Sequence, residues 1–247
     1  MSAPTPPALD LAACRTRQQR LRASLRREGV ETALLLDRRH VHYLTGYWHF
    51  SGNTRVAAVV PADGPVTLVA PGCPEETAAD ACRPYQAHRL ATLVDDQLGA
   101  LLAVAAPLLA GRTGCDERLA GTEHLLPLLY ALRRTKDADE VALLRQAIAC
   151  CDAAYARAKA RLRPGITEVH LYAELLAAAS EAAGEPIGDF GNDFQSGTPG
   201  GLPRPRPVEA GEMAIYDLTA IYRGYACDLC RSFVVGGQPS EAQLTAF

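Results

Sequence analysis

The sequence predicts two domains, an α/β domain over residues 8–132 followed by an α+β domain over residues 133–247. Three observations support this prediction. Short apolar strands alternate with helical patterns up to about residue 132, an order typical of α/β domains. The charged segment RRTKDADE (133–140) then leads into a long helix. Beyond the helices, a Gly- and Pro-rich segment precedes an apolar hairpin over 211–236, which indicates an antiparallel sheet.

Length and composition are those of an ordinary globular chain. The 247 residues are 48% hydrophobic and 21% charged, with a formal net charge of −3. That charge gives no electrostatic reason to expect nucleic acid or an anionic membrane as a partner. No apolar run approaches the ~20 residues of a membrane span, and the first residues lack the basic and apolar parts of a signal peptide. We therefore expect a cytoplasmic location, with no nucleic acid and no membrane as partner.

Eight cysteines are scattered along the chain. A chain of this length does not need disulfides to stabilise its core, so we expect reduced thiols. Cys227-Asp-Leu-Cys230 is a single C-x-x-C, and a structural zinc site needs about four ligands. The positions are Cys14, Cys73, Cys82, Cys115, Cys150, Cys151, Cys227 and Cys230.

The elements of the first domain follow one another at short intervals. A basic helix over 15–28 ends at Gly29, and a buried strand over 30–37 follows. We then expect strands over 54–61 and 66–71, helices over 75–82, 95–109 and 122–132, and short strands over 86–92 and 112–116.

His40 and His42 lie two residues apart in the segment 38–52. On a strand, this spacing places both imidazoles on one face, where they could bind a metal ion. The neighbouring Tyr43 and Trp48 favour a packed strand and turn instead, and this is our interpretation.

A long helix opens the second domain. Asp137 and Glu140 are spaced to cap each other's backbone, much as in a capping box. Pro164-Gly165 ends this helix, and Thr167 begins a second one that Gly184 closes. Apolar residues along the first helix recur at intervals of three and four, which predicts one buried stripe. The stripe comprises Val141, Leu144, Ile148, Cys151, Tyr155, Ala158 and Leu162.

Two aspartates interrupt the apolar hairpin IYDLTAIYRGYACDLC (215–230), which follows an expected ordered loop over 187–212. If Tyr222-Arg223 forms the turn, Asp217 lies directly opposite Asp228, with Cβ atoms roughly 5 Å apart. Like charges at that distance destabilise a hairpin unless a positive group lies between them, and the simplest such group is a metal ion. The alternative is two edge-strand carboxylates that face water or pair with nearby arginines.

Three segments resemble the pita-bread metallopeptidase superfamily, in the branch of Xaa-Pro aminopeptidases, prolidases and creatinase. GEMAIYDLTAIYRGYACDLCRSFVVG (211–236) resembles the strands with the family's first two metal-ligand aspartates. The segment 132–168 is similar to the opening helix of the catalytic domain. VHYLTGYW (41–48) resembles the N-terminal domain, which methionine aminopeptidases lack.

The resemblance implies a creatinase-like α/β N-terminal domain over 8–132 and an incomplete α+β pita-bread catalytic domain over 133–247. The complete protein would be an Xaa-Pro-type metallo-aminopeptidase or dipeptidase that acts on peptide substrates as a homodimer. Asp217 would be bidentate to one of two divalent metal ions, and Asp228 would bridge both. Carboxylate-rich ligation suits Mn²⁺, and Zn²⁺ or Co²⁺ also fits.

Two departures from the family pattern affect the expected activity. The family's remaining ligands, one histidine and two glutamates, follow the hairpin, whereas only Glu241 and no histidine follow it here before Phe247. We therefore expect residues 1–247 to be a truncated form that is inactive alone. Arg204 occupies the position at which Xaa-Pro enzymes place a histidine. Because an arginine stays charged and cannot relay a proton, it would bind a carboxylate or oxyanion of the substrate.

Two alternatives stay open. A creatinase-like C–N hydrolase has the same architecture but uses no metal, which fits poorly with two aspartates. A non-catalytic binding or dimerisation protein would use the N-terminal domain and the helical face. Coding sequence downstream of residue 247 would discriminate between these hypotheses, because an enzyme of this family needs a histidine and two glutamates there.

Overall fold

The structure is a computed structural model that describes residues 6–191 and 193–246. One compact unit comprises Ala8–Glu140, and the other comprises the described residues of 1–7 and 141–247. Asn192 in the expected loop and Phe247 at the end of the expected second domain lie outside the described residues.

The unit 8–140 contains a mixed sheet with the strand order β4-β3-β2-β1-β7-β8. β1 pairs antiparallel with β2 and parallel with β7. The strands are β1 (Thr32–Leu35), β2 (Ala57–Pro61), β3 (Thr67–Ala70), β4 (Ala81–Pro84), β7 (Thr113–Cys115) and β8 (Glu123–His124). The other elements are α1 (Leu11–Glu28), α2 (Arg38–Thr45), the hairpin β5 (His88–Arg89) and β6 (Thr92–Leu93), α3 (Gln97–Ala105), the 3-10 turn η1 (Ala106–Leu108) and α4 (Leu126–Arg134).

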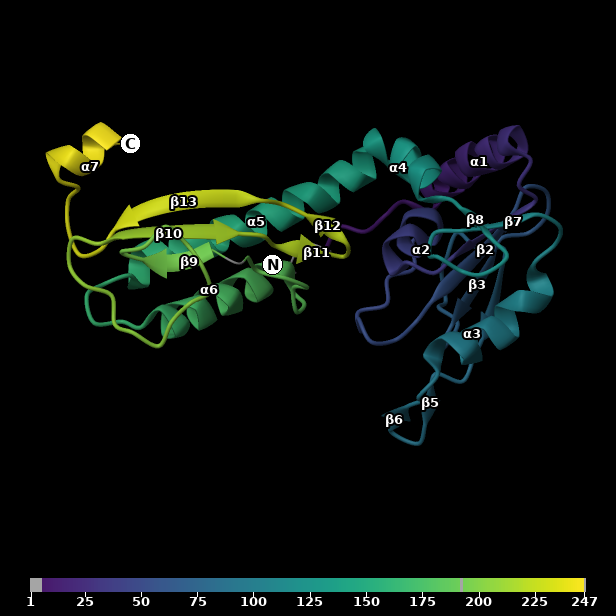
Figure 1. Ribbon diagram of the computed structural model, residues 1–247, viewed down its shortest axis with the longest axis horizontal. Coiled ribbons are helices and arrows are strands. Elements are labelled where there is room, and N and C mark those ends of the chain that lie inside the picture. Colours follow the sequence, from purple (N-terminus) through teal and green to yellow (C-terminus); the bar gives the residue numbers. More distant parts are fainter. Residues whose placement is uncertain (1–5, 192, 247) are drawn as a thin grey trace, which may run out of the picture. The chain divides into compact units, whose positions relative to one another are not determined.

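Helices lie on both faces of this sheet (Figure 1). Apolar clusters fill the space on each face. On one face, Leu21 of α1 and Leu129 of α4 belong to the same cluster as Leu35 of β1. On the other face, Leu101 of α3 packs with Leu34 of β1. Because successive strand residues point to opposite faces, a strand covered on both sides is a continuous apolar run. The strands β1 and β3 are accordingly buried along their whole length.

Capping residues set both ends of α1, which ends at Gly29 as predicted but begins at Leu11, four residues before the expected start. The side chain of Asp10 accepts hydrogen bonds from the backbone N–H groups of Ala12 and Ala13. Gly29 adopts the left-handed conformation with φ 67° and donates its N–H to the carbonyls of the last turn. Glycine adopts this conformation without strain, so the chain turns there into β1.

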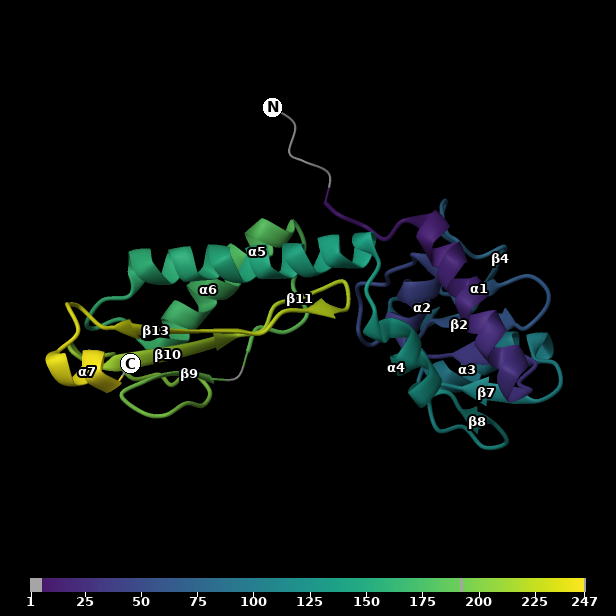
Figure 2. The same ribbon diagram turned by 90° about the horizontal axis from the view of Figure 1, so that it is seen from above.

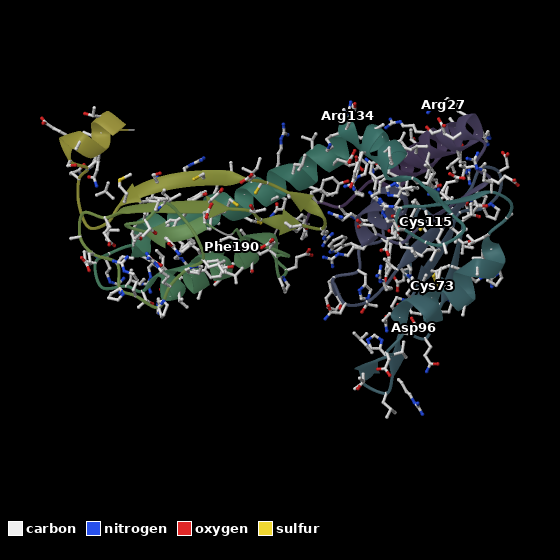
Figure 3. All side chains as sticks on the ribbon, in the orientation of Figure 1. Arg27, Cys73, Asp96, Cys115, Arg134 and Phe190 are labelled. Atoms are coloured by element: carbon white, nitrogen blue, oxygen red, sulfur yellow. A yellow bond between two sulfur atoms is a disulfide. The ribbon has the colours of Figure 1, made fainter. Side chains whose placement is uncertain are left out.

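The helix expected over 75–82 is wrong. Long-range backbone hydrogen bonds replace the helical ones, from Ala78 to the carbonyl of Thr45 and from Asp80 to that of Val66. The expectation of reduced thiols is wrong for two of the cysteines, since Cys73 and Cys82 form a disulfide across this segment (Figure 3). The other cysteines, all within the described residues, are free thiols.

The segment that contains His40 and His42 is the helix α2, which corrects the expected strand and turn. Asp37 caps its start by accepting from the N–H of Arg39, and Gly46 ends it in the left-handed conformation. Residues two apart point in different directions on a helix, so the two imidazoles do not share a face. His40 is buried, and its Nδ1 lies 2.8 Å from Oδ2 of Asp116.

The second unit contains an antiparallel sheet with the order β13-β10-β9, covered on one side by α5 and α6 (Figure 2). The segment 187–212, expected to be a loop, contains the strand β9. The strands are β9 (Asp193–Ser196), β10 (Met213–Leu218) and β13 (Leu229–Val234), with the small hairpin β11 (Ile221–Tyr222) and β12 (Tyr225–Ala226). The helices are α5 (Ala138–Arg161), α6 (Glu168–Ala183) and α7 (Glu241–Ala246).

Burial alternates along β10, as in a sheet with one covered face. Tyr216 points to the helices, with its ring stacked on that of Phe194 at 4.2 Å between centroids. Tyr155 of α5 donates its hydroxyl to the carbonyl of Tyr216 at 3.0 Å. The odd-numbered residues of β10, including Asp217, point to the opposite face, which is half-open.

The apolar stripe predicted along α5 is correct only in its second half. Cys151, Tyr155 and Ala158 are buried, but Ile148 is exposed. In the first half, Leu143 and other residues offset from the stripe are buried instead. A repeat of 3.5 residues drifts around a helix of 3.6 residues per turn, so a stripe with that spacing cannot follow one face over the whole length of α5.

Candidate metal centre

The turn between β11 and β12 sets the register of the two aspartates. Its central residues are Arg223 and Gly224, with φ of 48° and 81°, so Tyr222 pairs with Tyr225. A two-residue turn of this kind needs positive φ at both positions, which glycine favours. The expected turn over Tyr222-Arg223 is therefore wrong by one residue.

This shift moves the strand pairing by two residues. Asp217 lies opposite Cys230 rather than Asp228, and Asp228 follows β12 outside the regular ladder. A shift of two preserves the side on which residues point, because strand side chains alternate with a period of two. Asp217 and Asp228 are consequently diagonal neighbours, and their carboxyl groups lie within hydrogen-bonding reach of each other.

The environment of Asp217 is unfavourable for an isolated carboxylate. Burial, followed by the charge of Asp228, raises the pKa of Asp217. Its Oδ1 is buried and has no hydrogen-bond partner among the described residues. Two ionised carboxylates are both acceptors, so neither satisfies the other. A cation between the two carboxylates would relieve their repulsion and contact the buried Oδ1 of Asp217.

Asp193 adds a third carboxylate that the sequence patterns did not reveal. It lies on β9 directly opposite Asp217, and its charge also acts to raise the pKa of Asp217. Its Oδ1 accepts the N–H of Gly201 at 2.8 Å. Because β9 was expected to be a loop, no strand register was available to place Asp193 beside the pair.

The residues present fit a divalent cation as part of its ligand set. The orphaned Oδ1 of Asp217 and the exposed carboxylate of Asp228 are hard oxygen donors of the kind that Mn²⁺ and similar ions accept. Among the described residues, however, no group of three or more His, Cys, Asp or Glu side chains is arranged to hold a metal ion. Asp217 and Asp228 can therefore supply two ligands but not a complete site.

Arg204 lies near this sheet with its guanidinium already paired. Its Nε and Nη2 donate to the carboxylate of Glu168 at 2.9 and 2.6 Å, and Nη2 also donates to the carbonyl of Ser196. Its Nη1 makes no hydrogen bond with the described residues. The side chain is about one-third exposed, so Nη1 is the part of Arg204 that is available to a ligand.

Glu168 organises this cluster from the first turn of α6. Its side chain is 1% exposed and also accepts the backbone N–H groups of Ser196 and Arg204. Burial acts to raise the pKa of Glu168, but the hydrogen bonds from Arg204 and the backbone outweigh it and hold that pKa below its ordinary value. The sequence offered only one signal for this residue, its place directly after the capping Thr167.

Comparison with protein families gives two matches that together span most of the chain. The Creatinase/Prolidase N-terminal domain matches residues 17–147, and Metallopeptidase family M24 matches residues 142–247. Within the described residues, no helix has the length and hydropathy needed to cross a membrane.

Curated relatives include an Xaa-Pro aminopeptidase of Escherichia coli, 30% identical over 139 residues, or 53% of this chain and 31% of the relative. The uncharacterized peptidase YqhT of Bacillus subtilis is 30% identical over 113 residues, or 44% of this chain and 32% of the relative. The chain thus spans about a third of the length of the curated relatives it matches.

Solved structures share the fold at low sequence identity. The prolidase of Pyrococcus horikoshii superposes with a TM-score of 0.73 at 17% identity, over 93% of this chain and 67% of that structure. The dipeptidase PepE of Mycobacterium ulcerans gives 0.69 at 22% identity, over 95% and 68%. The matches to both parts of the chain, in this order, show that it belongs to the Xaa-Pro aminopeptidase, prolidase and creatinase branch of the pita-bread metallopeptidases, with a creatinase-type N-terminal domain and part of the catalytic domain.

Proposed function

We propose that this chain is part of an Xaa-Pro-type metallo-aminopeptidase or dipeptidase with a dinuclear metal site. The observation that best supports the proposal is the juxtaposition of Asp217 and Asp228, with a buried Asp217 oxygen that has no donor among the described residues. The remaining histidine and glutamate ligands would come from a segment that follows residue 247 in the complete protein. Residues 1–247 would then be inactive alone, and the functional domains would be 8–132 and 133–247.

In this proposal the chain's own residues bind the metal ions and orient the substrate. Asp217 and Asp228 would hold two divalent ions, most suitably Mn²⁺, with Zn²⁺ or Co²⁺ as alternatives. When bound, such ions supply Lewis-acid activation of water and of the scissile carbonyl. Arg204 would contact a substrate carboxylate through Nη1 while Glu168 keeps its fork in place. The Asp217 and Asp228 carboxylates would also keep the site negatively charged, which favours cation entry.

The proposal also covers partners and location. We propose that the substrate is a peptide, that the complete protein is a homodimer, and that it is cytoplasmic. The Cys73–Cys82 disulfide offers a test of location, because disulfides are rare in the cytosol of mesophiles. Trapping the thiols in intact cells should show these two cysteines in the reduced form if the protein is cytoplasmic.

A non-catalytic binding or dimerisation protein is the second candidate for residues 1–247. The incomplete set of metal ligands within the described residues favours it. The two candidates differ in divalent-ion binding, since a binding module has no need of the Asp217–Asp228 pair.

Activity in the complete protein tests the leading proposal. With Mn²⁺, it should release the N-terminal residue of an Xaa-Pro peptide, and Asp217→Asn or Asp228→Asn should lower kcat/KM by at least about 10³-fold. Residues 1–247 should show no release. Asp152→Asn, an exposed carboxylate on α5, is the matched control and should keep the activity. Full activity in both site variants would refute the proposed metal site.

The role of Arg204 is tested by substrate preference. The complete protein and its Arg204→His variant are assayed on an Xaa-Pro dipeptide and on its C-terminal amide. If Arg204 binds the carboxylate, the wild type should prefer the free acid and the variant should lose much of that preference. Equal acid-to-amide ratios in the two proteins would show that Arg204 does not contact the substrate.

A further inference from the structure

Two buried thiols of the second unit lie in contact. Sγ of Cys151 on α5 is 3.3 Å from Sγ of Cys227, which follows β12. Cys151 is fully buried, whereas Cys227 is 8% exposed. They are separated by 76 positions in the sequence, so only the tertiary structure brings them together. Disulfide formation would bring the sulfur atoms roughly 1.2 Å closer, since a disulfide S–S bond is about 2.05 Å.

The surroundings hold both thiols in place. Sγ of Cys151 donates to the carbonyl of Leu218 at 3.5 Å, and Sγ of Cys227 donates to that of Ala147 at 3.2 Å. The backbone N–H of Cys227 is bonded to the carbonyl of Ala220. The sulfur atoms therefore face each other between a helix and a strand segment that hydrogen bonds restrain.

The position of this pair connects it to the aspartates. Cys227 immediately precedes Asp228, and Leu218, whose carbonyl accepts the Cys151 thiol, immediately follows Asp217. A covalent link at this point would tether to α5 the segment on which Asp228 lies. Tethering would restrict the motion of the Asp228 carboxylate relative to Asp217.

We propose that Cys151 and Cys227 form an oxidisable dithiol site, which a peroxide converts to a disulfide that tethers the Asp228 segment to α5. The sulfur of the more exposed Cys227 attacks a peroxide oxygen, the O–O bond breaks, the thiol proton passes to the departing hydroxide, and a sulfenic acid and water form. The sulfur of Cys151 then attacks the Cys227 sulfur, the S–O bond breaks, and the departing hydroxide takes the Cys151 proton and leaves as water while the S–S bond forms. In the net reaction, two thiols and one hydrogen peroxide become one disulfide and two molecules of water.

Peptide mapping tests this site without metal or substrate, so the result is separate from that of the proposed function. The purified chain is treated with hydrogen peroxide, its remaining thiols are alkylated, and its digest is analysed by mass spectrometry. We expect a cross-linked peptide pair containing Cys151 and Cys227 that dithiothreitol separates. Amide exchange over residues 225–230 should slow by about tenfold in the oxidised form, because the segment then opens less often.

Matched variants make the outcome decisive. Cys150→Ser changes the adjacent buried thiol and should leave the cross-link intact, whereas Cys151→Ser and Cys227→Ser should each abolish it. Cys151→Ala and Cys227→Ala repeat the test, and circular dichroism confirms that each variant is folded. A peroxide-induced bond from Cys227 to the exposed Cys230, or a Cys151–Cys227 cross-link that leaves the exchange over 225–230 unchanged, would overturn the proposal.

Discussion

The two units of this chain differ in how completely their sheets are covered. In the unit 8–140, helices cover both faces of the sheet, and apolar clusters fill both sides. In the second unit, α5 and α6 cover one face of the sheet, and the other face exposes Asp217 to its carboxylate neighbours. The covered sheet is typical of a scaffold, whereas the half-open one leaves polar groups accessible to a ligand.

Buried charged groups in the two units also differ in whether opposite charges surround them. The guanidinium of Arg17 on α1 is fully buried and lies within ion-pair distance of Asp137, Asp139 and Glu140. Asp217 of the second unit lies beside other carboxylates, and its Oδ1 has no partner among the described residues. The buried charge of Arg17 is therefore compensated by opposite charge, whereas that of Asp217 is not. Uncompensated polar groups of this kind concentrate at functional sites.

The largest expected effect is on the compensated cluster. Arg17→Met removes the buried cation from beside three carboxylates, two of which are largely buried. We expect the free energy of unfolding of this unit to fall by about 3–5 kcal/mol. Urea unfolding followed by the fluorescence of Trp48, the chain's single tryptophan, measures it.

The control for this variant is Arg20→Met. Arg20 also pairs with Asp137, but its side chain is 45% exposed, so we expect a loss below about 1 kcal/mol. Equal losses in the two variants would contradict the view that burial makes the Arg17 cluster important.

A smaller loss is expected in the second unit when Glu168 is neutralised. Glu168→Gln replaces a buried acceptor of five hydrogen bonds with an amide, whose NH₂ group faces donors of Arg204, Arg206 and Ser196. We expect a destabilisation of about 2 kcal/mol, measured by native-state hydrogen exchange of β10 amides. Glu212→Gln, which removes a more exposed ion pair with Arg206, should cost clearly less.

The ionisation of Glu168 should also make the second unit sensitive to acid. Because its folded pKa lies below the ordinary value of 4.5, its stabilising contribution is complete above that pH and is lost as the pH falls through the lowered pKa. The stability difference between the wild type and Glu168→Gln should therefore shrink from about pH 6 to about pH 3. A difference that stays constant over this range would show that the Glu168 charge is not responsible.

The smallest expected effect has the opposite sign. In the absence of metal, Asp217→Asn removes like-charge repulsion with Asp228 and Asp193, and we expect a stabilisation of about 0.5–1 kcal/mol. Saturating Mn²⁺ should then stabilise the wild type more than the variant, since a ligand stabilises only the protein that binds it. Differential scanning calorimetry with and without Mn²⁺ measures both effects. Destabilisation of the metal-free variant would show that the uncompensated carboxylate is not a source of strain.

Local chemistry was sufficient to predict many elements of the fold. Residue types at fixed spacing predicted the end of α1 at Gly29 and the cap of α6 at Thr167. They also predicted that Glu140 accepts the N–H of Asp137. The helix α2 and strand β4 were missed. Short-range patterns were ambiguous in both segments. The Asp37 cap fixes the helix α2, and long-range backbone hydrogen bonds fix the segment that leads into β4.

The sequence by itself determined that Asp217 and Asp228 share one face of a hairpin, because strand parity survives a shift of two residues. Only the tertiary structure decided which groups surround them. The pairing of β9 with β10 places Asp193 opposite Asp217, and the packing of α5 brings Cys151 against Cys227. These contacts join residues far apart in the chain, and no spacing in the sequence encodes the register or packing of elements that meet only when the domain folds.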